Sequence, residues 1–376
     1  MNKVYKYRLY PTKEQIKSLT PQLTGHRILY NQALAQRKRF YEATRENISF
    51  FAQSALLPKI RKENNFIASC NYGSLQQTLR RLDKSFKAFF RRVKTEEKPG
   101  YPRFKAEHRF NTFTYGSFGD GCQIKDNRLY LQNVGKVKVK WHRALEGITK
   151  TLSVTRRNNK WYVAFIVECE PAILPNVNKS VGIDMGLNYF ITTNEGQQID
   201  APQYFRKSEK KLAKAQKKLS RRKKGSKRRN KARILLSNQY EKISNQRLDF
   251  CHKIAYSFVQ EYDDIAVEKL NIKGMVQNKY LSKSIADASW GIFLNILKAK
   301  AENAGRRFQE VSAKNTSQIC SSCGVIVKKS LAVRKHVCPS CGLSLSRDQN
   351  AALNILKRAR MEPSVLAMKF VVSPRS

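Results

Sequence analysis

The spacing of apolar positions changes several times along the chain, and each change predicts a different element. Residues 3–10 alternate apolar and charged side chains with the two-residue period of a strand, which Pro11 ends. Thr12 and Gln15 then form the pattern of a capping box, and helical spacing continues to about residue 93. The chain therefore begins with one strand and a block of helices.

A two-residue period returns between residues 112 and 170. Short alternating runs follow one another there, the longest from Trp161 to Val167, with turn residues at 126–127 and 158–159. Several short strands at close spacing predict a small barrel or sandwich. Because the strand at 3–10 has the same character, we expect it to join that sheet, which makes the helical block an insertion between its strands.

The remainder of the chain mixes strands with helices after a linker marked by Pro171 and Pro175. Residues 180–196 predict two strands and their turns. The predicted elements that follow are a helical stretch at 203–261 interrupted at Gly225-Ser226, a buried strand at 265–268, an amphipathic helix at 286–304, a strand at 308–311 and a last helix at 348–360. The pattern as a whole predicts an α+β multidomain protein.

The charge of the chain points to its partners. The 376 residues include 73 Lys and Arg against 28 Asp and Glu, a formal net charge of +45, while 41% of residues are hydrophobic. That apolar fraction can build buried cores, so the chain is not a disordered polycation, and its length suggests two or three domains. A surplus of this size favours a polyanionic partner, nucleic acid, and argues against a secreted scaffold or an ordinary metabolic enzyme.

The expected cellular location follows from two features that the sequence lacks. It has no run of about 18 apolar residues, which predicts no transmembrane helix and no membrane partner. The first ten residues alternate charged and aromatic side chains, unlike the apolar segment of a signal peptide. We therefore expect a protein of the reducing cytoplasm.

Two CxxC pairs separated by fourteen residues predict a zinc site. The spacing brings four thiolates together in tetrahedral geometry, and Gly324 and Gly342 permit the tight turn after each pair. Four thiolates close the coordination shell, so this zinc ribbon would be structural. The alternatives are four reduced cysteines or two disulfides, and His336 is another possible ligand. The predicted ligands are Cys320, Cys323, Cys338 and Cys341.

Three carboxylates form the second candidate site. Asp184 lies on a predicted strand, Glu268 closes another, and Asp348 opens the last helix. Each alone has an ordinary explanation, such as a turn residue or a helix-start acid. Their order, however, is that of a ribonuclease H-like nuclease, in which clustered carboxylates hold two Mg²⁺ ions for phosphodiester hydrolysis. We expect Asp184 to bridge the metals and the other two to complete their shells.

A basic run between Arg206 and Arg233 is the third candidate site. It has sixteen Lys and Arg in 28 residues and one acid, Glu209. A solvated helix face or a disordered tail is the ordinary explanation, whereas its position inside a globular segment favours contact with nucleic-acid phosphates. The candidate contacts are Arg206, Lys210, Lys214, Lys217, Lys218, Arg221, Arg222, Lys223, Lys224, Lys227, Arg228 and Arg229.

A weaker candidate surface is the stretch at 98–105, where aromatic residues stand between cations. Arg103 and Lys105 there suit phosphate contact beside base stacking. A rigid Pro-Gly turn with an anchored Tyr and Phe explains the same residues equally well.

Taken together, these motifs resemble the TnpB family of transposon-encoded RNA-guided nucleases, relatives of the ancestors of type V CRISPR effectors. The resemblance runs nearly end to end. Its motifs are Tyr-Arg-Leu-Tyr-Pro-Thr at 7–12, Tyr30-Asn31, Gly-Tyr-Pro-Arg-Phe at 100–104, Gly-Ile-Asp-Met-Gly at 182–186, Leu-Ser-Arg-Arg-Lys-Lys-Gly-Ser at 219–226, Val-Glu-Lys-Leu at 267–270, Ser317-Gln318-x-Cys320, the CxxC pairs and Arg347-Asp348-x-Asn350-Ala351-Ala352.

The resemblance implies a RuvC nuclease domain split by a zinc module, and a wedge barrel interrupted by a helical recognition domain. The implied boundaries are 1–10 and 111–173 for the wedge β-barrel, 11–110 for the recognition domain, 180–313 and 343–360 for the RuvC-like domain, 314–342 for the zinc-ribbon target-nucleic-acid-binding module, and 361–376 for a tail.

The resemblance also implies an activity. A guide RNA encoded at the transposon end pairs with double-stranded target DNA, which is cut beside a short motif with Mg²⁺ by a monomeric ribonucleoprotein. It assigns catalysis to Asp184, Glu268 and Asp348, with Arg334 near the scissile phosphate and Gln76 near the motif duplex. The alternatives are a transposase that performs strand transfer, and an RNA-guided regulator that binds without cleavage. The presence of all three acids counts against the regulator.

Overall fold

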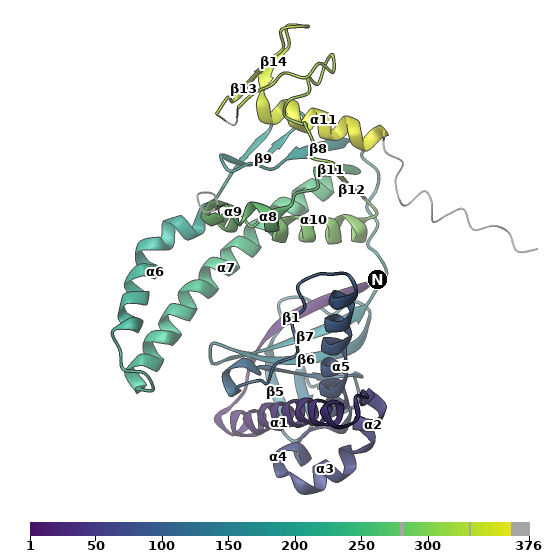
Figure 1. Ribbon diagram of the computed structural model, residues 1–376, viewed down its shortest axis with the longest axis vertical. Coiled ribbons are helices and arrows are strands. Elements are labelled where there is room, and N and C mark those ends of the chain that lie inside the picture. Colours follow the sequence, from purple (N-terminus) through teal and green to yellow (C-terminus); the bar gives the residue numbers. More distant parts are fainter. Residues whose placement is uncertain (279–281, 331, 362–376) are drawn as a thin grey trace, which may run out of the picture. The chain divides into compact units, whose positions relative to one another are not determined.

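The chain divides into two compact units, Met1–Glu170 and Pro171–Ser376. The computed structural model describes residues 1–278, 282–330 and 332–361 (Figure 1). The tail predicted at 361–376 lies, beyond Met361, outside the described residues.

The first unit is built on a seven-stranded antiparallel sheet. Its spatial order is β2-β6-β7-β1-β5-β4-β3, so the N-terminal strand pairs with β7 and β5 in the middle of the sheet, as predicted. The strands are β1 (Asn2–Tyr10), β2 (Thr112–Tyr115), β3 (Cys122–Lys125), β4 (Arg128–Leu131), β5 (Gly135–Lys140), β6 (Ile148–Arg157) and β7 (Lys160–Glu168).

The alternation read from the sequence sets the core of this sheet. Tyr5, Tyr7 and Leu9 of β1 are buried, and every second residue from Trp161 to Val167 joins them. Because successive side chains point to opposite faces, one face packs inward and the other carries the charges. β2 and β3 are the two edge strands of the sheet. In the segment that connects them, Phe118 N–H donates to the Lys150 carbonyl of β6 and Gly119 N–H donates to the Cys122 carbonyl of β3.

Five helices occupy the stretch between β1 and β2. The predicted capping box is present, because Gln15 N–H donates to Thr12 Oγ1 at 3.3 Å and Thr12 N–H donates to Gln15 Oε1 at 3.0 Å. A short 3-10 turn, Glu107–Arg109, precedes β2. The helices are α1 (Lys13–Thr44), α2 (Phe50–Ala55), α3 (Leu57–Glu63), α4 (Asn65–Ala68) and α5 (Tyr72–Lys94).

A buried histidine joins these helices to the sheet. His26 of α1 is 0% exposed, and its ring stacks on Phe113 of β2 at a centroid distance of 5.2 Å. Its two ring nitrogens lie 2.7 Å from Thr78 Oγ1 and 3.2 Å from Ser74 Oγ, both on α5. Burial lowers the pKa of His26 to about 3, so the ring is neutral in the folded protein.

The second unit contains a five-stranded mixed sheet in the order β10-β9-β8-β11-β12. β8, β9 and β10 are antiparallel neighbours, whereas β8, β11 and β12 run parallel. β10 was not recognised in the sequence. The strands are β8 (Ser180–Asp184), β9 (Tyr189–Thr193), β10 (Gln198–Asp200), β11 (Asp264–Glu268) and β12 (Arg307–Val311), and a separate pair is formed by β13 (Lys335–Val337) and β14 (Ser344–Ser346).

Helices cover both faces of this sheet (Figure 1). Val181, Ile183 and Val267 face a core with helices α7 and α10, while Ala266 packs with Ile355 of α11 on the other face. The helices of this unit are α6 (Tyr204–Ser220), α7 (Lys227–Glu261), α8 (Ile272–Met275), α9 (Ser282–Ala288), α10 (Trp290–Ala304) and α11 (Arg347–Met361).

The helix predicted at 286–304 is divided in two. Ser289 has a left-handed backbone conformation with φ of 60°, which ends α9 and starts α10 at Trp290. Sequence periodicity did not reveal this break, because Ser carries no signal as strong as Gly or Pro.

None of the helices in the described part of the chain combines the length and apolarity needed to cross a membrane.

The neutral His26 makes the stability of the first unit depend on pH. The unfolded chain takes up a proton below about pH 6.5, whereas the folded ring does so only near pH 3, so stability is complete above pH 6.5 and falls as the pH drops. We expect a loss of about 2 kcal/mol between pH 7 and pH 5, measured by hydrogen exchange of α5 amides. His26→Gln should abolish this dependence and exposed His108→Gln should retain it; equal profiles in all three proteins would contradict the assignment.

Candidate active site and metal centre

Asp184 and Glu268 end two adjacent parallel strands. Ile183 of β8 pairs with Val267 of β11, so the two acids that follow directly occupy neighbouring positions at the carboxyl ends. Paired residues of adjacent strands share a face and lie about 5 Å apart along the hydrogen-bonding direction. The sheet therefore presents two carboxylates side by side on the face that α11 covers.

A close backbone approach brings the third acid to the same face. A Cβ atom at Gly182 would lie only 2.1 Å from the carbonyl oxygen of Ala352, so a side chain here would push α11 away from β8. The φ of Gly182 is not positive, so a glycine is needed here because there is no room for a side chain, and not because of its backbone conformation. Because Asp348 lies one turn before Ala352, and Asp184 lies two residues after Gly182, the contact carries Asp348 toward the strand-end acids.

Of the three acids, Asp184 is the one whose pKa shows the effect of the other two. Burial, and then the neighbouring carboxylates of Glu268 and Asp348, raise the pKa of Asp184 well above its usual range. Burial also raises the pKa of Glu268, against the effect of a hydrogen bond from Thr316 Oγ1.

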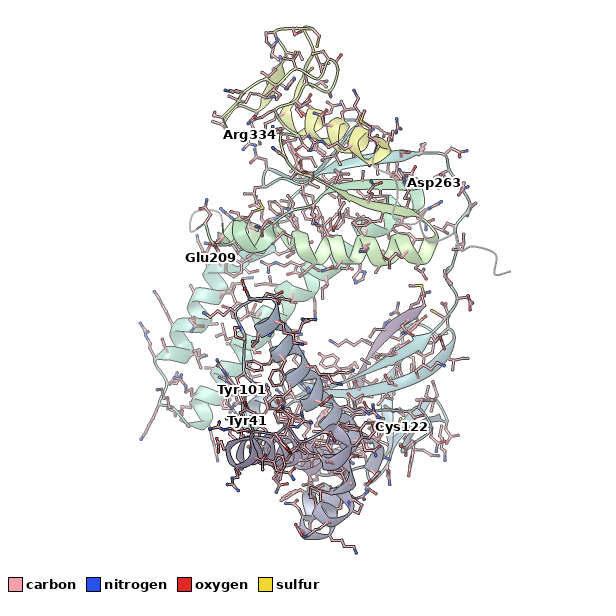
Figure 2. The ribbon with its side chains drawn as sticks, turned by 45° about the vertical axis from the view of Figure 1, so that its right-hand side comes forward. Tyr41, Tyr101, Cys122, Glu209, Asp263 and Arg334 are labelled. Carbon is pink, nitrogen blue, oxygen red and sulfur yellow. The ribbon has the colours of Figure 1, made fainter. Side chains whose placement is uncertain are left out.

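Two arginines lie at the start of α11. Arg347 pairs with Asp348 at 3.4 Å, and its N–H donates to the carbonyl of Arg334 at 2.8 Å. Figure 2 shows Arg334 on the side of the sheet opposite to Asp263, which stands just before β11 begins. The exposed Arg334 side chain therefore belongs to the end of the sheet that carries the acids.

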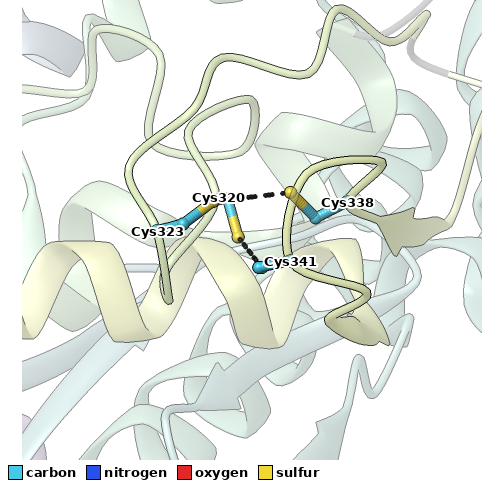
Figure 3. Close-up of side chains that lie close together, drawn as sticks. All are labelled: Cys320, Cys323, Cys338 and Cys341. Carbon is cyan, nitrogen blue, oxygen red and sulfur yellow. Dashed lines mark hydrogen bonds between the residues drawn. The ribbon is translucent and has the colours of Figure 1, made fainter.

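The four cysteines predicted as ligands come together (Figure 3). Their sulfurs all lie within 4.8 Å of one another, with 3.6 Å between Cys320 and Cys341 and 3.5 Å between Cys323 and Cys338. Thiolates at 2.3 Å from a tetrahedral zinc stand about 3.8 Å apart, whereas a disulfide requires about 2 Å. Since all four are free thiols, the geometry excludes the disulfide alternative and fits a metal.

The two CxxC turns have the same backbone geometry. Gly324 N–H donates to Cys320 and Gly342 N–H donates to Cys338, both at 3.0 Å, and both glycines have positive φ, 83° and 70°. Burial raises the pKa of the Cys320 thiol, but hydrogen bonds from the N–H groups of Cys323 and Ser322 outweigh it and bring the pKa to about 5. A hydrogen bond from the Cys341 N–H also lowers the pKa of Cys338, whereas the pKa of Cys323 is raised to about 11, so the turns favour the thiolate that zinc binds at Cys320 and Cys338.

His336 is not a ligand of this centre. It is fully buried, and its Nδ1 contacts Lys329 Nζ. Its Nε2 has no hydrogen-bond partner among the described residues, and His336 does not belong to the group of four sulfurs that lie within 4.8 Å of one another.

Two asparagines of α11 hold the first CxxC turn, and sequence reasoning assigned them no role. Asn350, which is 0% exposed, accepts from Ser321 N–H at 2.9 Å and donates to the Ile319 carbonyl at 2.8 Å. Asn354 donates to the carbonyls of Thr316 and Ile319 at 2.8 and 2.7 Å. The only sequence signal was Asn350 within the Arg-Asp-x-Asn-Ala-Ala motif. These bonds connect the cysteine turn to the helix that carries Asp348.

The basic run forms an antiparallel pair of helices, α6 and α7, around a small apolar seam (Figure 1). One face of α6 lines an open hollow of about 740 Å³. Its cations recur every three to four residues, so they share one side of the helix. They are Lys210, Lys214, Lys217, Lys218, Arg221 and, in the turn, Arg222.

Two of the residues predicted to contact phosphate also make hydrogen bonds within the fold. Arg229 donates to the carbonyls of Leu219 and Arg222, which closes the turn between the helices. The Arg206 side chain donates to Ser284 Oγ of α9. Lys223, Lys224, Lys227 and Arg228 lie in the turn or the first residues of α7.

A buried acid fixes the start of the basic pair. Asp287 of α9, 6% exposed, accepts from the N–H groups of Phe205 and Arg206 and pairs with Arg247 at 2.7 Å. The N-cap residue of α6, Gln203, makes no side-chain cap of its own. Asp287 therefore caps α6 although it lies 82 residues after Phe205 in the sequence, and no local sequence pattern could show this contact.

The three candidates of the first unit are partly engaged. Gln76 donates to Ser54 Oγ at 3.3 Å, so one of its amide N–H groups binds within the unit. Asn31 exchanges two hydrogen bonds with the backbone of Lys105, at 2.8 and 3.1 Å, and Tyr101 packs edge-on against Phe89. The stretch at 98–105, which has no regular secondary structure, is thus anchored at Tyr101 and Lys105, and Arg103 is exposed on it.

Three family models match the chain. One described as a probable transposase covers residues 164–279, one described as a Cas12f1-like TNB domain covers 290–355, and one described as a helix-turn-helix domain covers 1–46. Over 1–46 the structure has β1 and the single 32-residue helix α1, and thus no helix-turn-helix within that range.

Curated relatives match nearly the whole chain. It is 32% identical over 372 residues to a putative RNA-guided DNA endonuclease of Streptomyces pristinaespiralis, covering 95% of this chain and 89% of that protein. It is 26% identical over 371 residues to the putative RNA-guided DNA endonuclease InsQ of Escherichia coli (strain K12), covering 94% and 91%. The chain therefore belongs to the TnpB family, as its motifs indicated.

A solved structure supports the mixed α+β fold. The mini-RNA-guided endonuclease CRISPR-Cas_phi3 superposes with a TM-score of 0.52, covering 97% of this chain and 93% of that one at 10% identity. At so low an identity the likeness concerns the fold alone.

Removal of the metal from the cysteine centre should loosen residues 316–327 and 335–346. Without it, four neighbouring thiols lose their common ligand, and the binding free energy of a structural zinc is also folding free energy. We expect chelation to speed hydrogen exchange at the Gly324 and Gly342 amides by about a hundredfold or more, with a smaller effect in the first turn of α11. The amides of β7 serve as the control. Unchanged exchange at both glycines would contradict a structural metal.

Proposed function

We propose that this protein is the RNA-guided DNA endonuclease of a transposon. The observation that carries the proposal is the convergence of Asp184, Glu268 and Asp348 on one end of a sheet, in a chain that belongs to the TnpB family. A guide RNA would supply sequence recognition by base pairing with double-stranded DNA, and the protein would hold the backbone and read a short flanking motif.

The mixed sheet with α11 would be the ribonuclease H-like RuvC domain, within 180–313 and 343–360. In support, two acids end parallel neighbours and the third opens the helix packed on them. The cysteine turns and β13 would form the zinc ribbon at 314–342, and β14, which pairs with β13, lies just after that range. In the first unit, the sheet of 1–10 and 111–173 would be the wedge barrel, and the helices at 11–110 the recognition domain.

The three acids fit Mg²⁺, which prefers hard oxygen ligands. Asp184 is the best placed to bridge two ions, because it is influenced by both other acids. When bound, the ions would supply an activated water and neutralise the leaving oxygen. The chain itself orients the ligands: Thr316 holds one oxygen of Glu268, and Gly182 allows Asp348 to approach. Arg334 would lie near the phosphate, since its backbone adjoins the residue before Asp348.

The zinc would have a structural role and not a catalytic one. Four sulfurs close the coordination shell. The centre is connected to the nuclease acids by Asn350 and Asn354, and by Thr316, which contacts Glu268. We infer that the zinc ribbon helps to hold the active site together while it binds the target strand.

The second candidate function is strand transfer by a transposase, because the model matching residues 164–279 is described as a probable transposase. The same acids would serve either reaction. A transposition assay without any other transposase separates the two: integration of a donor end by this protein alone would favour strand transfer over guided cleavage.

Asp184→Asn should separate binding from cleavage. The substitution removes the charge that a metal needs but keeps the size of the side chain, so the co-purifying RNA should remain bound. Cleavage of a guide-matched plasmid in Mg²⁺ should fall by about a thousandfold or more. The matched control is Asp200→Asn on exposed β10, which should cut normally. Cleavage by the Asp184 variant at the wild-type rate would reject the site.

The cationic face of α6 should set the salt dependence of RNA binding. Replacing Lys214, Lys217 and Lys218 by Gln should lower the slope of log affinity against log salt by about 0.7–0.9 for each lost contact. The control replaces Lys17, Lys87 and Lys253, which are each already paired with an acid one turn away. If both triple variants show the same slope in filter-binding titrations, α6 does not contact the phosphate backbone of the RNA.

A further inference from the structure

A cavity between the helices of the first unit has no part in the proposal above. Its volume is about 460 Å³, within the usual range for small-molecule sites, and it opens to solvent among α1, α2, α3 and α5. Its floor is apolar, formed by the buried side chains of Leu29, Ala33 and Leu79. Gln32 and Gln36, one turn apart on α1, stand in its wall.

A chain of hydrogen bonds fixes the amide of Gln36. Asp83 accepts from both Nη atoms of Arg37 at 3.3 Å, and Arg37 Nε donates to Gln53 Oε1 at 2.7 Å. A guanidinium only donates, so the oxygen of Gln53 must face it. Gln53 Nε2 then donates to the Ala33 carbonyl and to Gln36 Oε1, both at 2.9 Å.

This order of hydrogen bonds fixes the orientation of the Gln36 side-chain amide. Its oxygen accepts from the buried Gln53, which leaves its two N–H groups as the polar atoms that Gln36, a residue of the cavity wall, can offer to a ligand. Gln32 adds a second amide on the same helix face, with both a donor and an acceptor. Lys59 and Glu63 are exposed at the rim. The cavity thus combines an apolar floor, two adjacent amides, and one cation and one anion at its rim.

We propose that this cavity binds a single unstacked base of the RNA, an inference that rests on the proposed RNA-guided function. A base ring suits the apolar floor, its polar edge suits the two amides, and its phosphate suits Lys59. The net charge of +45 makes a nucleic acid the favoured source of such a ligand. RNA is favoured over duplex DNA, because loops and bulges present unstacked bases, whereas a base in a duplex must first be flipped out.

The test uses the full-length protein with the RNA that co-purifies with it. Ultraviolet irradiation should crosslink one nucleotide to the peptides that contain Gln32 or Lys59. Gln32→Leu combined with Gln36→Leu should weaken binding of that RNA about 5- to 150-fold, with an unchanged salt slope, because the lost groups are neutral. The matched control, Gln123→Leu on β3 of the same unit, should bind as the unaltered protein does.

An abasic substitution at the crosslinked nucleotide completes the experiment. It should cost as much as the double variant and add nothing to it, since both remove the same contact. Gln32→Leu alone, at an exposed position, keeps the test informative if the double variant unfolds. RNA that binds both variants with unaltered affinity overturns the cavity proposal, and so does a crosslink that appears only after target DNA is added. If no RNA co-purifies with the unaltered protein, the proposed function itself fails.

Discussion

The contact between Gly182 and Ala352 is the constraint on which the candidate active site depends. A glycine in the middle of β8 allows the backbone of α11 to lie against the strand, where any Cβ would meet a carbonyl at 2.1 Å. Ala351 and Ala352, both fully buried, keep the helix side of this contact equally small. The short separation is what brings an acid at the start of a helix near two acids at strand ends. The Gly-Ile-Asp motif therefore couples packing to chemistry within three residues.

The cysteine centre and the carboxylates are less separate than their chemistry suggests. α11 carries Asp348 in its first turn, and Asn350 and Asn354 in the next residues hold the turn around Cys320. Thr316 receives one of these bonds on its carbonyl and gives its hydroxyl to Glu268. Because buried amides that lose a partner are costly, the asparagines favour one arrangement of helix and turn. A metal held by the four sulfurs would thereby stabilise the surroundings of two catalytic candidates.

The sequence could predict the parts of this protein that are encoded locally. The capping box at Thr12, the four cysteines and the ends of β8 and β11 follow from residue type and spacing alone. The remote contacts could not be predicted in this way. Asp287 caps α6 although it lies 82 residues after Phe205 in the sequence, and the chain of hydrogen bonds from Asp83 to Gln36 connects three helices. Such bonds leave no periodic signal, because each partner is an ordinary polar residue in its own helix. The use of Arg229 in a turn was missed for the same reason.

The charge surplus is distributed in a way that packing does not require. The apolar seam between α6 and α7 needs only a few residues, such as Leu212, Ala215 and Leu236. The rest of α6 is cationic at every exposed turn, and these charges repel one another in the free protein. Near the start of the helix, Glu209, which pairs with Lys283, and the distant Asp287 offset them. Phosphates bound along the helix pair would relieve this repulsion and stabilise the pair. The surplus would therefore make the stability of the pair depend on the proposed nucleic-acid partner.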